Sequence, residues 1–235
     1  MKSATWNVLI GLLLSASSLS AWAKSAEIIA IGRLEAGRKQ CSATLLSSHQ
    51  IVTAAHCLFN NKTRKLYHPS YVNFYAGYQD GSYRLSSMAR SYVIGVKSFP
   101  SGKFDEKFLY NDWAVVTLST PIGCSIEPLT IDHKPATRQT MSTFGYGSNT
   151  PHQQVASHGC EYALPPRENT ALRLKNCHVE SGYSGAPLLR REQGKWHLVG
   201  LISAQAKDSK QRLRQMAVPS RAFAQHIKPK ACRQL

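Results

Sequence analysis

The chain has 235 residues and a formal net charge of +16, from 29 Lys and Arg against 13 Asp and Glu. This length can bury a sizeable core, as one large all-β unit or as two small barrels. A strongly basic surface favours non-specific association with polyanions, such as anionic lipid headgroups or acidic polysaccharides, and it equally suits a solubility role. There is no arginine-rich block, RNA-binding aromatic signature or zinc-finger spacing, so we expect no specific nucleic-acid recognition.

Residues 1–23 have the pattern of an export signal: Lys2, then an apolar run at 8–14, then Ala-Trp-Ala at 21–23. The apolar run is too short and too interrupted by serine to favour the alternative, an uncleaved membrane anchor. We therefore expect cleavage after Ala23 and a secreted or periplasmic protein. Removing one lysine and no acid leaves 28 basic and 13 acidic residues, a net charge of 28 − 13 = +15. We expect no transmembrane segment elsewhere, and a monomer.

Strand patterns dominate the exported part. Residues 71–75 alternate with a period of two, and 113–118 and 196–202 are apolar runs typical of buried strands. Turn residues at 79–82 and 101–103 separate such segments. One good helix candidate lies in the tail, at about 219–228, between Pro219 and Pro229. Short strands, frequent turns and a terminal helix favour an all-β fold.

Three segments carry residues suited to acyl transfer. His56 ends the run Thr-Ala-Ala-His, Asp112 leads into an apolar strand, and Ser184 lies in Gly-Tyr-Ser-Gly. A serine hydroxyl is a poor nucleophile at neutral pH, so it needs a nearby base whose tautomer is fixed by a third group. We predict Ser184 as the nucleophile, His56 as general base and then acid, and Asp112 as the orienting carboxylate. Asp105 and Glu106 are rival carboxylates, but they lie in a lysine-flanked loop.

In order and setting, these segments resemble the trypsin/chymotrypsin-like serine endopeptidases, particularly their compact bacterial members. The resemblance spans nearly the whole exported chain, and it implies two six-stranded antiparallel Greek-key barrels with the active site in the cleft between them. We place the N-terminal barrel at 24–122 and the C-terminal barrel, with its terminal helix, at 123–235. The implied activity is hydrolysis of polypeptide substrates through an acyl-enzyme, without a cofactor.

The resemblance also implies supporting residues. The amides of Gly182 and Ser184 would form the oxyanion hole, and glycine at 182 and 185 permits a tight turn without a Cβ in the way. Ser203 falls where relatives place a serine hydrogen-bonded to the catalytic aspartate. Phe144-Gly145-Tyr146-Gly147 resembles the Gly-aromatic-Gly strand end of the family's second barrel.

Six cysteines in an exported chain suggest three disulfides. The resemblance implies a bond between Cys41 and Cys57. For the other four cysteines we favour Cys160–Cys177 and Cys124–Cys232, and the sequence leaves those two pairings open.

The residue before the nucleophile departs from the digestive relatives. They carry an aspartate that pairs with a newly cut N-terminal amine, whereas this chain has Tyr183 and no Ile-Val-Gly-Gly type sequence at its mature start. Tyr183 cannot form that ion pair. We hypothesise that folding alone completes the site, without an activating cleavage.

The residues of the primary specificity pocket are also inferred from the resemblance. They are His178 at the floor, with Gln205 and Ile202 on the wall strand. No aspartate occupies the floor, so a preference for arginine or lysine is not supported. His178 and the positive charge favour acidic P1 residues, whereas Gln205 favours small or polar ones, and both options remain open.

Two other functions compete with the protease. A catalytically inactive exported module could bind polyanions through its basic surface, although it would gain nothing from a complete triad. A metal protein could use a cluster of histidines and cysteines, but this cluster lacks compact ligand spacing, and export favours a disulfide between its cysteines. We therefore expect no metal site. The residues of that cluster are His152, His158, Cys160, Cys177 and His178.

Overall fold

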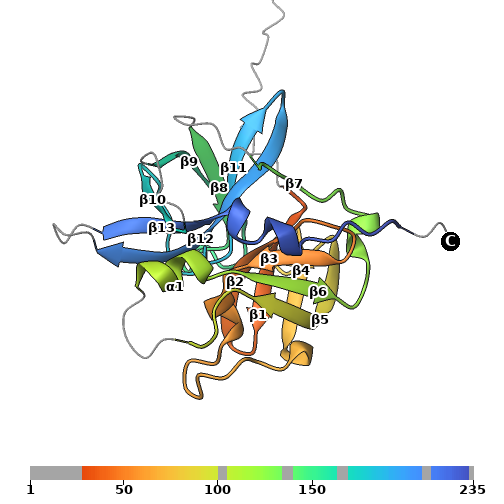
Figure 1. Ribbon diagram of the computed structural model, residues 1–235. Coiled ribbons are helices and arrows are strands. Elements are labelled where there is room, and N and C mark those ends of the chain that lie inside the picture. The colour runs from red at the N-terminus through yellow and green to blue at the C-terminus, as the bar shows by residue number, and fades with distance from the viewer. Residues whose placement is uncertain (1–27, 100–104, 134–139, 163–168, 208–212, 233–235) are drawn as a thin grey trace, which may run out of the picture.

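The computed structural model describes residues 28–99, 105–133, 140–162, 169–207 and 213–232. The predicted export signal and the turn at 101–103 lie outside these residues. The described chain folds into two β-barrels packed side by side, with β1–β6 in one and β8–β13 in the other (Figure 1). No helix among these described segments is long and apolar enough to cross a membrane.

The first barrel closes in the order β1-β2-β3-β6-β5-β4, with every neighbouring pair antiparallel. The period-two pattern predicted near 71–75 is confirmed in β4, where Val72, Phe74 and Ala76 are buried and the residues between them are less so. The strands of this barrel are β1 (Ile31–Ala36), β2 (Lys39–Leu45), β3 (Gln50–Thr53), β4 (Val72–Ala76), β5 (Leu85–Ile94) and β6 (Ala114–Leu118).

The second barrel has the same topology as the first. Its sheet runs β8-β9-β10-β13-β12, and β11 pairs with both β8 and β12, which closes the ring in the first barrel's order. A short extra strand, β7, lies parallel to β12 at its edge. The strands are β7 (Thr130–Ile131), β8 (Met141–Gly145), β9 (Val155–Tyr162), β10 (Leu172–Lys175), β11 (Pro187–Glu192), β12 (Lys195–Lys207) and β13 (Leu213–Pro219). The predicted all-β fold of two six-stranded barrels is confirmed.

Helical structure is short and falls at the joints of the fold. A helix that the sequence analysis did not predict, α1 (Glu106–Asn111), precedes the catalytic aspartate candidate and packs Leu109 against Met216 of the second barrel. Its N-cap is Asp105, whose side chain accepts from the amide of Phe108 at 2.6 Å. Three 3₁₀ turns connect strands: η1 (Ala55–Leu58), η2 (Pro69–Tyr71) and η3 (Ile122–Cys124).

The tail differs from the single helix that we predicted. It forms two 3₁₀ turns, η4 (Ser220–Ala222) and η5 (Ala224–His226), separated by Phe223. Phe223 has φ −126°, outside the helical range, and its side chain is fully buried in the core beside Trp113. This packing explains why the tail is not one helix. A continuous helix would require a helical φ at Phe223, and the backbone that buries its side chain has a different φ.

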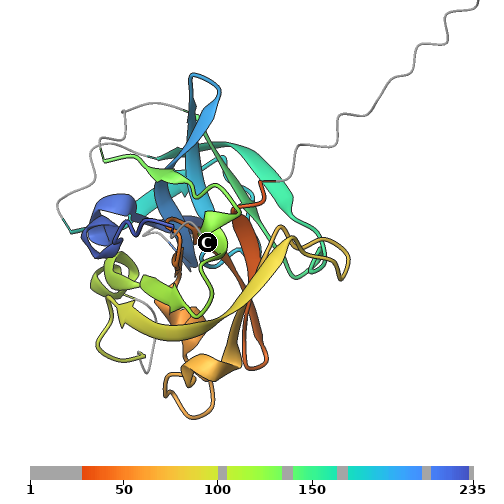
Figure 2. The ribbon, with the colours of Figure 1, turned by 90° about the vertical axis from the view of Figure 1, so that its right-hand side faces the viewer.

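All three predicted disulfides are confirmed: Cys41–Cys57, Cys160–Cys177 and Cys124–Cys232. The last one attaches the tail to the start of the interbarrel segment, so the end of the chain returns to the first barrel (Figure 2). Two further contacts hold it there: Gln50 donates to the carbonyl of His226 and accepts from the amide of Lys228. The tail therefore fastens the two barrels together.

Candidate active site

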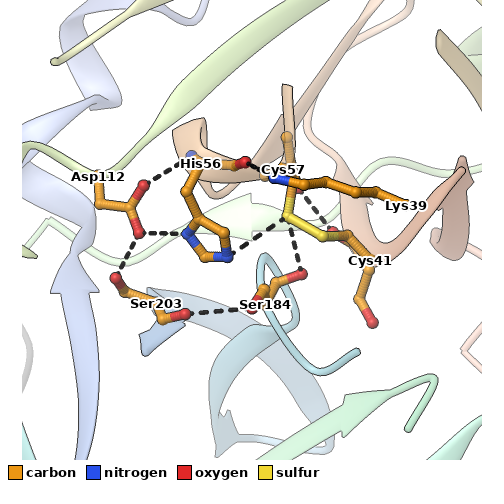
Figure 3. A network of polar contacts seen from close by, with 9 residues as sticks. Lys39, Cys41, His56, Cys57, Asp112, Ser184 and Ser203 are labelled. Atoms are coloured by element: carbon orange, nitrogen blue, oxygen red, sulfur yellow. Dashed lines mark hydrogen bonds and ion pairs between the residues drawn. A yellow bond between two sulfur atoms is a disulfide. The ribbon is translucent and has the colours of Figure 1, made fainter. Parts of the chain in front are cut away.

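His56 and Asp112 meet at the edge of the first barrel. His56 lies in η1, directly after β3, and Asp112 lies between α1 and β6. The two residues are close together because β3 and β6 are paired. The imidazole Nδ1 is 2.7 Å from Asp112 Oδ2, and the His56 amide donates to Oδ1 at 2.8 Å (Figure 3). Because a carboxylate only accepts, Nδ1 carries the proton and Nε2 keeps its lone pair.

Asp112 is fully buried, so its negative charge depends on hydrogen bonds from its neighbours. A third donor, the Ser203 hydroxyl on β12, is 2.5 Å from Oδ2. The predicted neighbour of the aspartate, Ser203, thus lies within hydrogen-bond distance of it. Since Ser203 belongs to the second barrel, one carboxylate joins both halves of the molecule.

Ser184 lies across from His56, in the turn that leads into β11 (Figure 3). Its hydroxyl donates to the Ser203 carbonyl at 3.2 Å, and it lies on the Nε2 side of the imidazole (Figure 3). The three predicted positions therefore gather at the junction of the two barrels, although they are separated by 56 and 72 residues along the sequence.

Two glycines let the backbone turn tightly around Ser184. Gly182 has φ +95° and Gly185 has φ +82°, both in the left-handed region that L side chains rarely adopt. A Cβ on Gly182 would lie 2.3 Å from the carbonyl oxygen of Tyr146, and one on Gly185 would lie 2.2 Å from that of Ser42. Only glycine fits at either position.

The amides of Gly182 and Ser184 donate to no acceptor within the part of the chain that the structure describes. The carbonyl of Ser181 instead accepts from the amide of Ser148 at 2.7 Å. In a trans peptide the N–H points opposite to the C=O, so this bond turns the Gly182 N–H away from the loop of Ser148. Both amides thus remain available to bind an anion.

A residue that the sequence analysis missed, Ser42, holds the nucleophile turn against the first barrel. Its amide donates to the Ser184 carbonyl at 2.8 Å, and its hydroxyl donates to the Gly182 carbonyl at 3.0 Å. Its own carbonyl accepts from Thr53 at 2.8 Å. No motif marks Ser42, because its role comes from contacts about 140 residues away along the chain.

Tyr183 occupies the position before the nucleophile as a buried anchor. Its side chain is 3% exposed, and its phenol donates to the Val155 carbonyl at 2.8 Å. Burial, and then the nearby charge of Glu180, raises the pKa of Tyr183 to about 12, so the phenol stays neutral and keeps donating. A neutral hydrogen bond therefore fixes this part of the turn.

A cavity of about 660 Å³ lies beside this turn, between the start of β9 and the segment before Ser184. The predicted pocket residues His178 and Gln205 line it, whereas the buried Ile202 is absent from its lining. Gln215, which the sequence analysis missed, also lines it. Gln205 and Gln215 each donate to the Val179 carbonyl, at 3.2 and 3.3 Å.

The histidines and cysteines that the sequence offered as possible metal ligands can be located in the described part of the chain. Within the described residues, the group of potential ligand atoms that lies close together is Cys41, His56 and Cys57. The two cysteines are joined as a disulfide, so they offer no thiolate. Cys160 and Cys177 are likewise bonded to each other.

Comparison with known proteins is consistent with this geometry. The family model described as trypsin matches residues 23–227, which is most of the chain. This chain belongs to the trypsin family. Human mannan-binding lectin serine protease 1 is 28% identical over 200 residues, and clotting factor C of Tachypleus tridentatus is 25% identical over 199. These alignments cover 71% and 70% of this chain but only 28% and 19% of those proteins.

Solved structures share the fold. A Glu endopeptidase in complex with MPD superposes with a TM-score of 0.66 at 22% identity, covering 85% of this chain and 89% of its own. A thermostable serine protease from an extremophilic microorganism gives a TM-score of 0.65 at 17% identity, covering 84% and 94%. Family membership supports assigning the chain as a serine endopeptidase.

Proposed function

We propose that this chain is an exported serine endopeptidase that hydrolyses peptide bonds through an acyl-enzyme on Ser184. The observation that carries the proposal is the buried Asp112 carboxylate, which meets His56 Nδ1 at 2.7 Å and leaves Nε2 on the side of the imidazole where Ser184 lies (Figure 3). An arrangement of base, orienting acid and nucleophile is what an activated serine requires.

In the acylation step, the Ser184 O–H turns from the Ser203 carbonyl toward His56 Nε2, which accepts its proton as Oγ attacks the substrate carbonyl. The resulting imidazolium lies against Asp112, whose buried charge stabilises it. The same proton then passes from Nε2 to the leaving amine. Water attacks the acyl-enzyme in the second half, with His56 again as the base.

The oxyanion that forms during each attack needs donors that are already in place. The free amides of Gly182 and Ser184 are suited to this role, and each such donor contributes about 3 kcal/mol to stabilising the transition state. Tyr183 and Ser42 hold the turn in this conformation without an inserted N-terminal amine. We therefore propose that the chain starting at Lys24 is active without further cleavage.

For the P1 residue we propose small or polar side chains. Gln205 on β12 and Gln215 on β13 both reach across to Val179, so they draw the opposite walls of the cavity together. His178, which would favour acidic P1 residues, lines the same cavity, but no hydrogen bond of its side chain is recorded across it among the described residues. Peptides that differ only at P1 test this choice, and a clear preference for glutamate would contradict it.

The basic composition, which includes 29 Lys and Arg, makes non-specific binding to polyanions an additional expectation rather than the main function. The substrate that we propose is a polypeptide.

A fluorophosphonate probe tests the proposed activity directly. We expect one equivalent to label the purified protein and to inhibit peptide hydrolysis, and we expect Ser184→Ala to abolish both with the fold retained. Labelling of a different serine, or hydrolysis that survives Ser184→Ala, would contradict the proposal. Chelators should have no effect.

A further inference from the structure

Lys39 extends along η1 to the catalytic histidine. Its Nζ donates to the backbone carbonyl of His56 at 2.7 Å, and its side chain is half-buried (Figure 3). An ammonium has three donors, so this bond leaves two of them for other acceptors.

A second cation, Arg64, contacts the same aromatic ring as Lys39. The Phe99 ring centroid lies 5.4 Å from Lys39 Nζ and 4.9 Å from the guanidinium carbon of Arg64. Both distances are within the range of cation–π contacts. Arg64 also donates to the Phe99 carbonyl at 3.3 Å, so both cations contact the same residue.

The loop that presents Arg64 is tightly folded. Arg64 has φ +58°, which is unusual for a residue with a side chain, and its amide donates to the Asn60 carbonyl at 2.8 Å. The Asn60 side chain accepts from the amides of Lys62 and Thr63. The position of Arg64 is therefore set by the backbone of its loop.

Neither Lys39 nor Arg64 forms an ion pair with a carboxylate among the residues that the structure describes. A partly buried cation without a carboxylate partner is unfavourable, and burial lowers the pKa of Lys39 to about 8, with the charge of Asp112 acting in the opposite direction. At neutral pH both side chains remain positive, so the pair would be stabilised by an anionic ligand.

The pair lies on one side of the catalytic residues. Ser203 approaches Asp112 and Ser184 from β12, whereas Lys39 reaches His56 from the opposite side, next to the Cys41–Cys57 disulfide (Figure 3). If β12 pairs with the acyl half of the substrate by strand addition, the leaving half must pass over the Lys39 side.

We propose that Lys39 and Arg64 bind an acidic side chain of the substrate at the first or second residue after the scissile bond. The inference rests on the proposed endopeptidase function. It identifies a substrate class: polypeptides in which the cut bond is followed closely by aspartate or glutamate.

A digest of a proteome-derived peptide library, read by mass spectrometry, tests the proposal whatever residue the protein prefers at P1. We expect Asp and Glu to be enriched about five- to tenfold at one of the two positions after the cut, as for a partly desolvated ion pair. Lys39→Met should remove most of this enrichment. Lys62→Met, which removes an equal charge from an exposed residue of the Arg64 loop, should leave it unchanged.

Matched peptides with Glu or Gln at the enriched position sharpen the test. The Glu/Gln ratio of kcat/KM should fall as pH rises through about 8, because Lys39 loses its charge there, while Arg64 keeps its own. Any pH effect that is common to both peptides cancels in the ratio. In Lys39→Arg the ratio should be retained and should no longer fall above pH 8.

A ratio near one in the unmodified protein, or a ratio unchanged in Lys39→Met, would overturn the proposal. Lys39→Met should lower kcat/KM by a larger factor for the Glu peptide than for a simple ester substrate without residues after the scissile bond. Failure of ester hydrolysis and fluorophosphonate labelling in the unmodified protein would instead refute the proposed function, so the two failures can be distinguished.

Discussion

The two barrels share one strand order, yet they hold their catalytic groups in different ways. The first barrel fixes His56 and Asp112 through side-chain hydrogen bonds to a fully buried carboxylate. The second fixes Ser184 through backbone conformation, with glycines at positive φ on either side of it. The comparison teaches that the position of His56 depends on the polar groups around it, whereas the position of Ser184 depends in addition on two places where a side chain would not fit.

The largest effect is expected from removing the polar groups of the first barrel. His56→Ala should lower kcat by about 10⁵- to 10⁶-fold, as for other serine proteases in which the base is removed. Asp112→Asn should cost about 10⁴-fold, because the amide favours the wrong imidazole tautomer, as in the well-studied trypsin-type triad. Steady-state kinetics with an ester substrate measure both effects, and circular dichroism checks the fold.

If Asp112→Asn kept nearly full activity, the carboxylate would have only a structural role. In that case the first barrel would not hold its catalytic group in the way described above.

A smaller but still large effect is expected from adding a side chain to the second barrel. Gly185→Ala places a Cβ 2.2 Å from the Ser42 carbonyl and Thr53 Oγ1, so the nucleophile turn must move away from the first barrel. We expect a loss of at least about 100-fold in kcat, since a misplacement near 1 Å has that cost. Rates should be normalised to the fraction of the protein that is folded.

Gly194→Ala is the matched control for this prediction. Gly194 has φ +80°, close to that of Gly185, but a Cβ there would meet nothing within 4 Å. The alanine should cost about 1–2 kcal/mol of unfolding free energy from backbone strain alone, with normal kcat. Equal behaviour of the two variants would show that strain, and not the contact with Ser42, explains the loss.

The smallest effect is expected at Tyr183. Tyr183→Phe removes the hydrogen bond to the Val155 carbonyl, which should destabilise the protein by about 1 kcal/mol and lower kcat only modestly. KM should change little, because the substitution removes one hydroxyl from a side chain that is only 3% exposed. Thermal unfolding and kinetics of the chain starting at Lys24 measure both.

The activity of the unmodified chain starting at Lys24 tests whether an activating cleavage is needed. If the chain starting at Lys24 were inactive until it was cut to expose a new N-terminus, the role of Tyr183 as a permanent anchor would be wrong. The hydrogen bond to Val155 would then be a packing detail.

The sequence allowed prediction of the proposed catalytic residues and of the strand-rich fold. His56, Asp112, Ser184 and Ser203 were identified because their residue types and flanking segments carry information locally. Ser42, Lys39 and Gln215 could not be identified in this way, since each acquires its role from a backbone carbonyl that lies elsewhere in the sequence.

The errors in secondary structure have a similar origin. The predicted tail helix is divided because the buried Phe223 leaves the helical conformation, which is a tertiary effect. The short helix α1 was missed because its capping residue, Asp105, lies among charged residues that are typical of a loop. Six residues with one cap are too short to give a clear helical period.

The central claim is that Ser184 becomes acylated with His56 as its base. Acid-quenched mass spectrometry of the protein mixed with a nitrophenyl ester tests it most directly. We predict a mass increase of one acyl group per chain, located on the peptide that contains Ser184, formed far more slowly in His56→Ala. An adduct on another residue, or turnover of the ester without any adduct at Ser184, would contradict the account.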